Sequence, residues 1–85
     1  MPSKTVTVGS SVGLHARPAA VISEAAADLD AEVTLAVGGE EPVDAASSLL
    51  IMTLGASHGD TVEVAGDDQA AVDAIAALVE KDLDA

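Results

Sequence analysis

The feature that most constrains the fold is a switch between two hydrophobic periods along the chain. At residues 4–8, 32–37 and 61–65, apolar side chains alternate with polar ones, which is the pattern of a β-strand with one buried face. At residues 18–28 and 69–84, apolar side chains recur every three or four positions, which is the pattern of an amphipathic helix. Because each such element has an apolar face to bury, the chain is predicted to pack helices against one sheet.

Two shorter elements complete the predicted order. The glycine pair at residues 38–39 is typical of a hairpin turn, and residues 40–43 then form a short strand in which Pro42 favours an edge position. A short helix is predicted over residues 48–54, and Gly55 can end it. The resulting order is βαββαβα. Because each strand has one polar face, we expect an α+β fold with an antiparallel sheet.

Composition limits how such a fold can be stabilised. We expect one small domain, residues 1–85, whose core is built from Val, Leu, Ile, Ala and Met, because the chain has no aromatic side chain. The lack of cysteine excludes disulfides and thiolate metal sites. The formal net charge of −12 argues against nucleic-acid binding, which needs a basic surface. The sequence predicts neither a signal peptide nor membrane insertion, so we expect a cytoplasmic protein.

A chemically distinctive segment joins the first strand to the first helix, and it reads Gly13-Leu14-His15-Ala16-Arg17-Pro18-Ala19. Proline is tolerated in the first turn of a helix, because the N–H that it lacks would be unpaired there anyway. His15 is therefore predicted at the N-cap or immediately before it. The backbone amides expected to stay unpaired are those of Ala16, Arg17, Ala19 and Ala20.

Such a helix start can bind an anion, and phosphate above all. Arg17 adds a guanidinium whose geometry suits phosphate oxygens. The helix dipole disfavours the imidazolium, so the His15 ring is expected to be neutral and nucleophilic near physiological pH. This is the arrangement that a covalent phosphohistidine requires. The alternative is a capping histidine followed by a surface arginine.

The same segment resembles the active-centre signature of HPr, the phosphocarrier of the bacterial-type phosphoenolpyruvate:sugar phosphotransferase system. A second segment, residues 43–55 (VDAASSLLIMTLG), is similar to the regulatory-serine region of that family. The two segments lie at the expected distance from each other, and the resemblance covers essentially the whole chain. It implies an open-faced β-sandwich with strand order 1-4-2-3 and three helices on one face.

The resemblance also implies a function and a site. Phosphate from phosphoenolpyruvate would pass through Enzyme I to the ring Nδ1 of His15, and then to a IIA domain for sugar uptake. Arg17 and the amides of Ala16 and Arg17 would hold the phosphate, and Pro18 would fix the first turn. The protein would be a stoichiometric carrier, not an enzyme, and would need no cofactor or metal. We expect a monomer.

Ser47 falls at the position of the serine that is phosphorylated in some members of the family. Ser47 or Asp44 can also simply cap the short helix. Members that have the regulatory serine kinase often carry a hydrophobic residue directly after this serine, whereas this chain has Ser48. Both readings of Ser47, a regulated serine and a structural cap, therefore remain open.

The short helix after Ser47 carries an apolar stretch. Leu49, Leu50 and Met52 alternate around it, so some of them are expected in the core. In the family, an exposed apolar patch on this helix docks partner proteins. Helical phase makes Leu49 and Met52 the candidates for that patch.

The sequence leaves alternatives to the carrier. A paralogue could serve a regulatory branch or dihydroxyacetone phosphorylation. An acidic acyl carrier protein has a similar size and charge, but it needs an Asp-Ser-Leu helix start in an all-helical bundle, and this tripeptide is absent. A plain interaction module would use Leu49 and Met52, with His15 only as a cap. A metal site joining His58 to His15 lacks further ligands at suitable spacing.

The acidic, lysine-poor composition is typical of proteins from a high-salt cytoplasm. It predicts that the fold needs salt to be stable. Repulsion among −12 charges acts on a small domain with a thin stability margin. It reaches about 30 Å at 0.01 M salt but only about 3 Å at 1 M. We therefore expect the melting temperature to rise steeply between dilute buffer and molar KCl, as followed by circular dichroism. A melting temperature that barely moves would mean that the acidic surface is no adaptation to salt.

Overall fold

The computed structural model of the protein describes residues 2–81. Strands and helices follow one another in the predicted order βαββαβα. The elements are β1 (Ser3–Thr7), α1 (Ala16–Asp28), β2 (Val33–Val37), β3 (Val43–Asp44), α2 (Ser48–Thr53), β4 (Thr61–Gly66) and α3 (Gln69–Glu80).

The four strands form one antiparallel sheet in the order β1-β4-β2-β3. β4 therefore lies between β1 and β2, although it is the last strand in the sequence. The register places Val62 opposite both Val6 and Val37, and Val64 opposite Leu35. The inward-facing residues of three strands thus form one continuous apolar surface. The expectations of an α+β fold and of strand order 1-4-2-3 are both confirmed.

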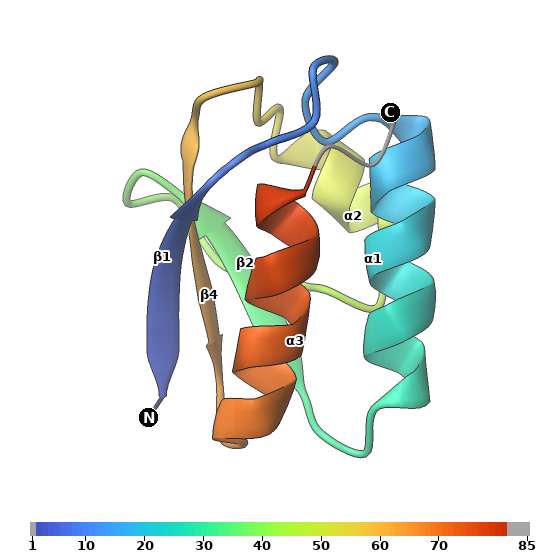
Figure 1. Cartoon of the computed structure of the whole chain (residues 1–85), viewed down its shortest axis with the longest axis vertical. Helices are drawn as coiled ribbons and strands as arrows, with labels where there is room; N and C mark the ends of the chain where they lie inside the picture. The colour runs from blue at the N-terminus through green and yellow to red at the C-terminus, as the bar shows by residue number, and fades with distance from the viewer. Residues whose placement is uncertain (1, 82–85) are drawn as a thin grey trace.

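The helices cover one face of this sheet, and the opposite face is open (Figure 1). α3 packs on β1 and β4, and α1 lies beside α3 and α2. The core between the layers is aliphatic, and its largest fully buried side chains are Ile22, Leu35, Ile51 and Ile75. Because a fully buried Leu or Ile contributes only about 1.5–3 kcal/mol, a core without aromatic side chains leaves a small margin.

The boundaries of several elements differ from the sequence expectations. The third strand is restricted to Val43–Asp44 instead of residues 40–43, because Pro42 has no N–H to donate to a strand ladder. α1 begins at Ala16, two residues before Pro18. The predicted last helix extended to residue 84, and residues 82–84 lie outside the described part of the chain. These differences do not change the order or the pairing of the elements.

The architecture answers one of the functional alternatives. An acyl-carrier-like protein would be an all-helical bundle, whereas this chain has a four-stranded sheet. Within residues 2–81, no helix combines the length and the apolar character that crossing a membrane requires.

The start of α1 is fixed by backbone contacts between two loops. The Leu14 N–H donates to the Ala56 carbonyl at 2.9 Å, and the Gly13 N–H donates to Ser10 O at 3.0 Å. Gly13 has a φ of +78°, and a Cβ at this position would lie 2.4 Å from the Ala56 carbonyl oxygen. Only glycine satisfies both the backbone conformation and this close approach. The loop before α1 is therefore held against the loop that precedes β4.

A Gly13→Ala substitution should consequently destabilise the fold by about 2 kcal/mol or more, because it adds a clash to an unfavourable backbone conformation. Gly39→Ala is the matched control, since Gly39 also has a positive φ, +83°, but a Cβ there would meet nothing within 4 Å. Urea unfolding in molar KCl measures the free energy of unfolding of both variants. Equal decreases in the free energy of unfolding of the two variants would show that the contact with Ala56 is not tight.

Candidate functional site

His15 is the N-cap of α1, one of the two positions predicted for it. Its backbone is extended, with φ −86° and ψ −164°, and its carbonyl accepts the Ala19 N–H at 2.8 Å. The side chain is exposed and makes no capping hydrogen bond. The cap is therefore a backbone cap, and the imidazole ring is left accessible for another role.

The backbone amides of Ala16 and Arg17 provide the positive end of the site. Within residues 2–81, neither amide donates to an acceptor, as expected for the first turn of a helix. The predictions of free amides at Ala19 and Ala20 are wrong, because α1 begins at Ala16. The Ala19 N–H therefore closes the first helical turn, and the Ala20 N–H lies inside the helix. The helix start therefore offers two amides, at the end where its dipole is positive.

Arg17 is exposed in this first turn, and in the described part of the chain no carboxylate forms an ion pair with it. Its guanidinium is available to an anion bound at the helix start. Pro18 is buried, as its predicted structural role requires. The site thus combines an accessible imidazole, two unpaired amides and one cation within three successive residues.

A second loop lies alongside the site. The Gly59 N–H donates to Val8 O at 3.1 Å, and the Val8 N–H donates to Asp60 O at 2.9 Å. Together with the bond between Leu14 and Ala56, these contacts place residues 55–59 against the segment that precedes His15. His58 is exposed in this loop, as expected. Residues 2–81 contain no group of three side chains that could hold a metal ion.

α2 brings exposed apolar side chains to the same end of the molecule. Leu49 is 68% exposed, Leu50 41% and Met52 37%, and we call these three residues the apolar patch. The expectation that some of them belong to the core is wrong, because Ile51 fills that role and is fully buried. The structure therefore adds Leu50 to the predicted pair Leu49 and Met52.

Val12, in the loop before His15, is 54% exposed and was missed from the sequence. The sequence does contain a signal for it, because Val12 is a single apolar residue between Ser11 and Gly13 in a segment predicted to be a loop.

Ser47 is the N-cap of α2. Its hydroxyl accepts the Leu50 N–H at 3.3 Å, while the Asp44 carboxylate accepts the Ala46 N–H at 2.9 Å. Of the two candidate caps, Ser47 therefore caps the helix, and Asp44 stabilises the turn before it. The Ser47 side chain is half-buried, and α2 packs against α1, whose N-terminus carries His15.

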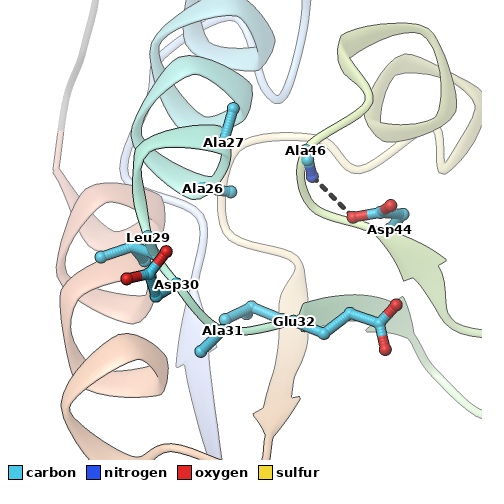
Figure 2. A pocket seen from close by; sticks show the side chains of 9 residues that line it. Ala26, Ala27, Leu29, Asp30, Ala31, Glu32, Asp44 and Ala46 are labelled. Carbon is cyan, nitrogen blue, oxygen red and sulfur yellow. Dashed lines mark hydrogen bonds between the residues drawn. The ribbon is translucent and has the colours of Figure 1, made fainter.

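A pocket of about 360 Å³ lies at the other end of α1, lined by residues that include Ala26, Ala27, Asp30 and Glu32 (Figure 2). α1 has 13 residues, so this pocket is about 20 Å from His15 along the helix axis. Figure 2 also shows that the Asp44 carboxylate is engaged by the Ala46 amide. The pocket is separate from the candidate site and contributes nothing to it.

The chain is similar to a known protein family and to several known proteins. A family model described as "PTS HPr component phosphorylation site" matches residues 2–81. The phosphocarrier protein HPr of Streptomyces coelicolor is 39% identical over 87 aligned positions, covering 99% of this chain and 94% of the relative. The phosphocarrier protein NPr of Shewanella violacea is 40% identical, covering 95% and 91%. HPr of Haloferax volcanii is 43% identical, covering 85% of each.

Solved structures agree with these sequence matches. The crystal structure of HPr-C-His from Thermoanaerobacter tengcongensis superposes with a TM-score of 0.87 at 28% identity, covering 100% of this chain and 98% of that one. HPr from Bacillus anthracis superposes with a TM-score of 0.79 at 34% identity, covering 92% and 95%. The similarity therefore extends over the full sheet and all three helices.

Proposed function

The chain belongs to the HPr family of phosphocarriers of the phosphotransferase system, and on this premise we propose that His15 is the residue that carries the phosphoryl group. The observation that supports this assignment most strongly is the accessible, uncapped ring of His15 at the start of α1. Two amides that have no acceptor within residues 2–81 and the Arg17 guanidinium lie directly after it. The chain thus combines a nucleophile with a place for the anion that it would receive.

In the proposed reaction, the donor is phospho-Enzyme I and the final acceptor is a IIA domain. The lone pair of the unprotonated His15 ring nitrogen attacks phosphorus and forms a new P–N bond. The bond from phosphorus to the donor atom of Enzyme I breaks, and its electron pair returns to that atom. Charge on the peripheral phosphoryl oxygens would be stabilised by Arg17 and by the amides of Ala16 and Arg17.

Transfer onward reverses these events with an acceptor side chain as the nucleophile. His15 then regains a free ring nitrogen, so the protein leaves the cycle unchanged. We expect it to act as a stoichiometric carrier without turnover of its own. The apolar patch on α2 is the proposed docking surface for both partners, because exposed Leu and Met side chains bury area at little desolvation cost.

The sugar branch is the function that we propose first. A paralogue of a regulatory or dihydroxyacetone branch would use the same site and differ only in its partner. Transfer from the phosphorylated protein to each purified IIA protein of the same organism distinguishes these functions.

We also propose a high-salt host. The net charge of −12 and the similarity to HPr of Haloferax volcanii support this proposal.

His15→Ala should abolish phosphorylation by Enzyme I and phosphoenolpyruvate, because the variant lacks the nucleophile. Mass measurement should show one added phosphate on the unmodified protein and none on the variant. His58→Ala is the control, and it should accept phosphate normally. Arg17→Ala keeps the nucleophile and should slow the transfer about 100-fold, the typical cost of losing one donor to a developing charge. A phosphorylated His15→Ala protein would contradict the assignment.

Phosphorylation of Ser47, if a kinase recognises it, should slow phosphoryl transfer to His15. It would add about −1.5 to −2 charges directly before the apolar patch. Because an anion at a helix start is favourable, the loss should appear in partner affinity and not in stability.

Two variants of Ser47 separate regulation from capping. Ser47→Asp retains a good cap, so it should keep the stability and slow the transfer. Ser47→Ala loses the cap, so it should cost about 1 kcal/mol in urea unfolding and leave the transfer rate unchanged. A Ser47→Asp protein that accepts phosphate as fast as the unmodified protein would count against a regulatory role.

A further inference from the structure

The turn before β4 contains a side-chain contact that the proposed reaction does not use. The Ser57 N–H donates to an oxygen of the Asp60 carboxylate at 2.9 Å, and the Asp60 N–H donates to the Ser57 carbonyl at 3.0 Å. Gly59, with a φ of +88°, allows the chain to turn between them. Because Asp60 is exposed, this contact and not burial holds its carboxylate in place.

The backbone of Asp60 is itself held by the sheet. Its carbonyl accepts the Val8 N–H at 2.9 Å, and the Gly59 N–H donates to the Val8 carbonyl at 3.1 Å. These bonds continue the antiparallel ladder between β1 and β4. Asp60 is therefore a fixed point from which the carboxylate reaches back to Ser57.

The amide that Asp60 accepts belongs to the same peptide group as the carbonyl that holds Leu14. The Ser57 N–H and the Ala56 carbonyl are the two ends of that group, and the Ala56 carbonyl accepts the Leu14 N–H at 2.9 Å. Because a peptide group is planar, a bond at its N–H fixes the direction of its carbonyl. A carboxylate acceptor also polarises the group and thereby strengthens the bond to Leu14.

Leu14 in turn sets the position of His15. The Leu14 side chain is buried, and the backbone of Gly13 lies so close to this peptide group that a Cβ on Gly13 would be 3.0 Å from Ser57 Cα. A rotation of the peptide group would therefore displace the chain that leads into α1. The His15 ring and the two amides at the start of α1 follow directly, and transfer depends on their alignment with the phosphoryl group.

The charge of Asp60 gives a second, opposite expectation. Asp60 is the only acidic residue between Asp44 and Glu63, and a carboxylate near a phosphoryl group is electrostatically unfavourable. An uncharged oxygen could accept the same N–H, although in a weaker bond. If Asp60 acted through its charge alone, its removal would speed phosphoryl transfer. If it acts through its hydrogen bond, loss of the acceptor slows the transfer.

We infer that Asp60 is a positioning residue for phosphoryl transfer, which orients the Ala56–Ser57 peptide group and thereby holds the chain that leads to His15. This inference rests on the proposed function. Because Asp60 acts through the backbone, its effect is on the rate of transfer within the complex and not on the affinity for the partner.

The test compares two variants that both remove the charge. Asp60→Asn keeps an oxygen that can accept the Ser57 N–H, and Asp60→Ala does not. Transfer from the phospho-Enzyme I of the same organism is followed by rapid quench in molar KCl. At saturation, we expect Asp60→Ala to be about tenfold slower than Asp60→Asn, the fold-change that the loss of one such hydrogen bond brings. The half-saturating concentrations should agree within about twofold, because the apolar patch is unchanged in both variants.

Amide hydrogen exchange tests the same contact without Enzyme I. The Leu14 amide should exchange about tenfold faster in Asp60→Ala than in Asp60→Asn, measured relative to the core amides of β4 so that changes in global stability cancel.

Asp68→Ala is the matched control. Asp68 is the N-cap of α3, and its carboxylate accepts the Ala70 N–H at 3.1 Å, so this variant loses a similar bond that is not connected to Leu14. Its transfer rate and its relative Leu14 exchange should stay within about twofold of those of the unmodified protein.

Equal rates at saturation for Asp60→Asn and Asp60→Ala, or equal exchange of Leu14 in the two variants, would overturn the inference alone. An unmodified protein that takes no phosphate on His15 would overturn the proposed function, and with it the role of Asp60 in transfer.

Discussion

The hydrogen bond from the Leu14 amide to the Ala56 carbonyl is the constraint on which the site depends. It ties the loop after β1 to the loop before β4, and it requires a glycine at position 13 for the close approach. The chain is thereby turned so that His15 is extended and α1 begins immediately after it. Without that anchor, neither the position of the ring nor the two unpaired amides beside it would be defined.

The fold that supports this anchor has little stability to spare. Its core contains only aliphatic side chains, and Leu49, Leu50 and Met52 remain exposed, although a domain of this size would gain from burying them. Leaving three large apolar side chains in water has a cost that packing alone does not justify. It is explained if the surface of α2 is buried in a complex part of the time.

The surface charge and the local charge at the start of α1 have opposite signs. All 15 acidic residues lie at positions 24–44 and 60–85, and this negative charge keeps the surface hydrated and repels other acidic proteins. At the start of α1, Arg17 and the positive end of the helix dipole provide the local positive potential that the proposed phosphoryl group would need. Over long distances, the negative surface would cancel the positive potential at the start of α1. The two can coexist when salt limits the range of charge interactions to a few ångströms.

Sequence reasoning was reliable where the controlling interactions are local. Alternating valines and helical stripes predicted three strands and the two long helices, and turn and cap residues predicted the short strand and α2. The segment from Gly13 to Ala19 predicted the candidate site, because caps and proline act within a few residues. The pairing of the strands could not be predicted in this way. Periodicity shows which face of a strand is buried but not which strand lies beside it, so the order β1-β4-β2-β3 came from family resemblance and not from the pattern. The exposure of Leu50 and Val12 and the pairing of the Ala19 amide depend on where α1 begins and on what packs against α2. Only the tertiary structure decides these, because they arise from contacts between residues far apart in the chain.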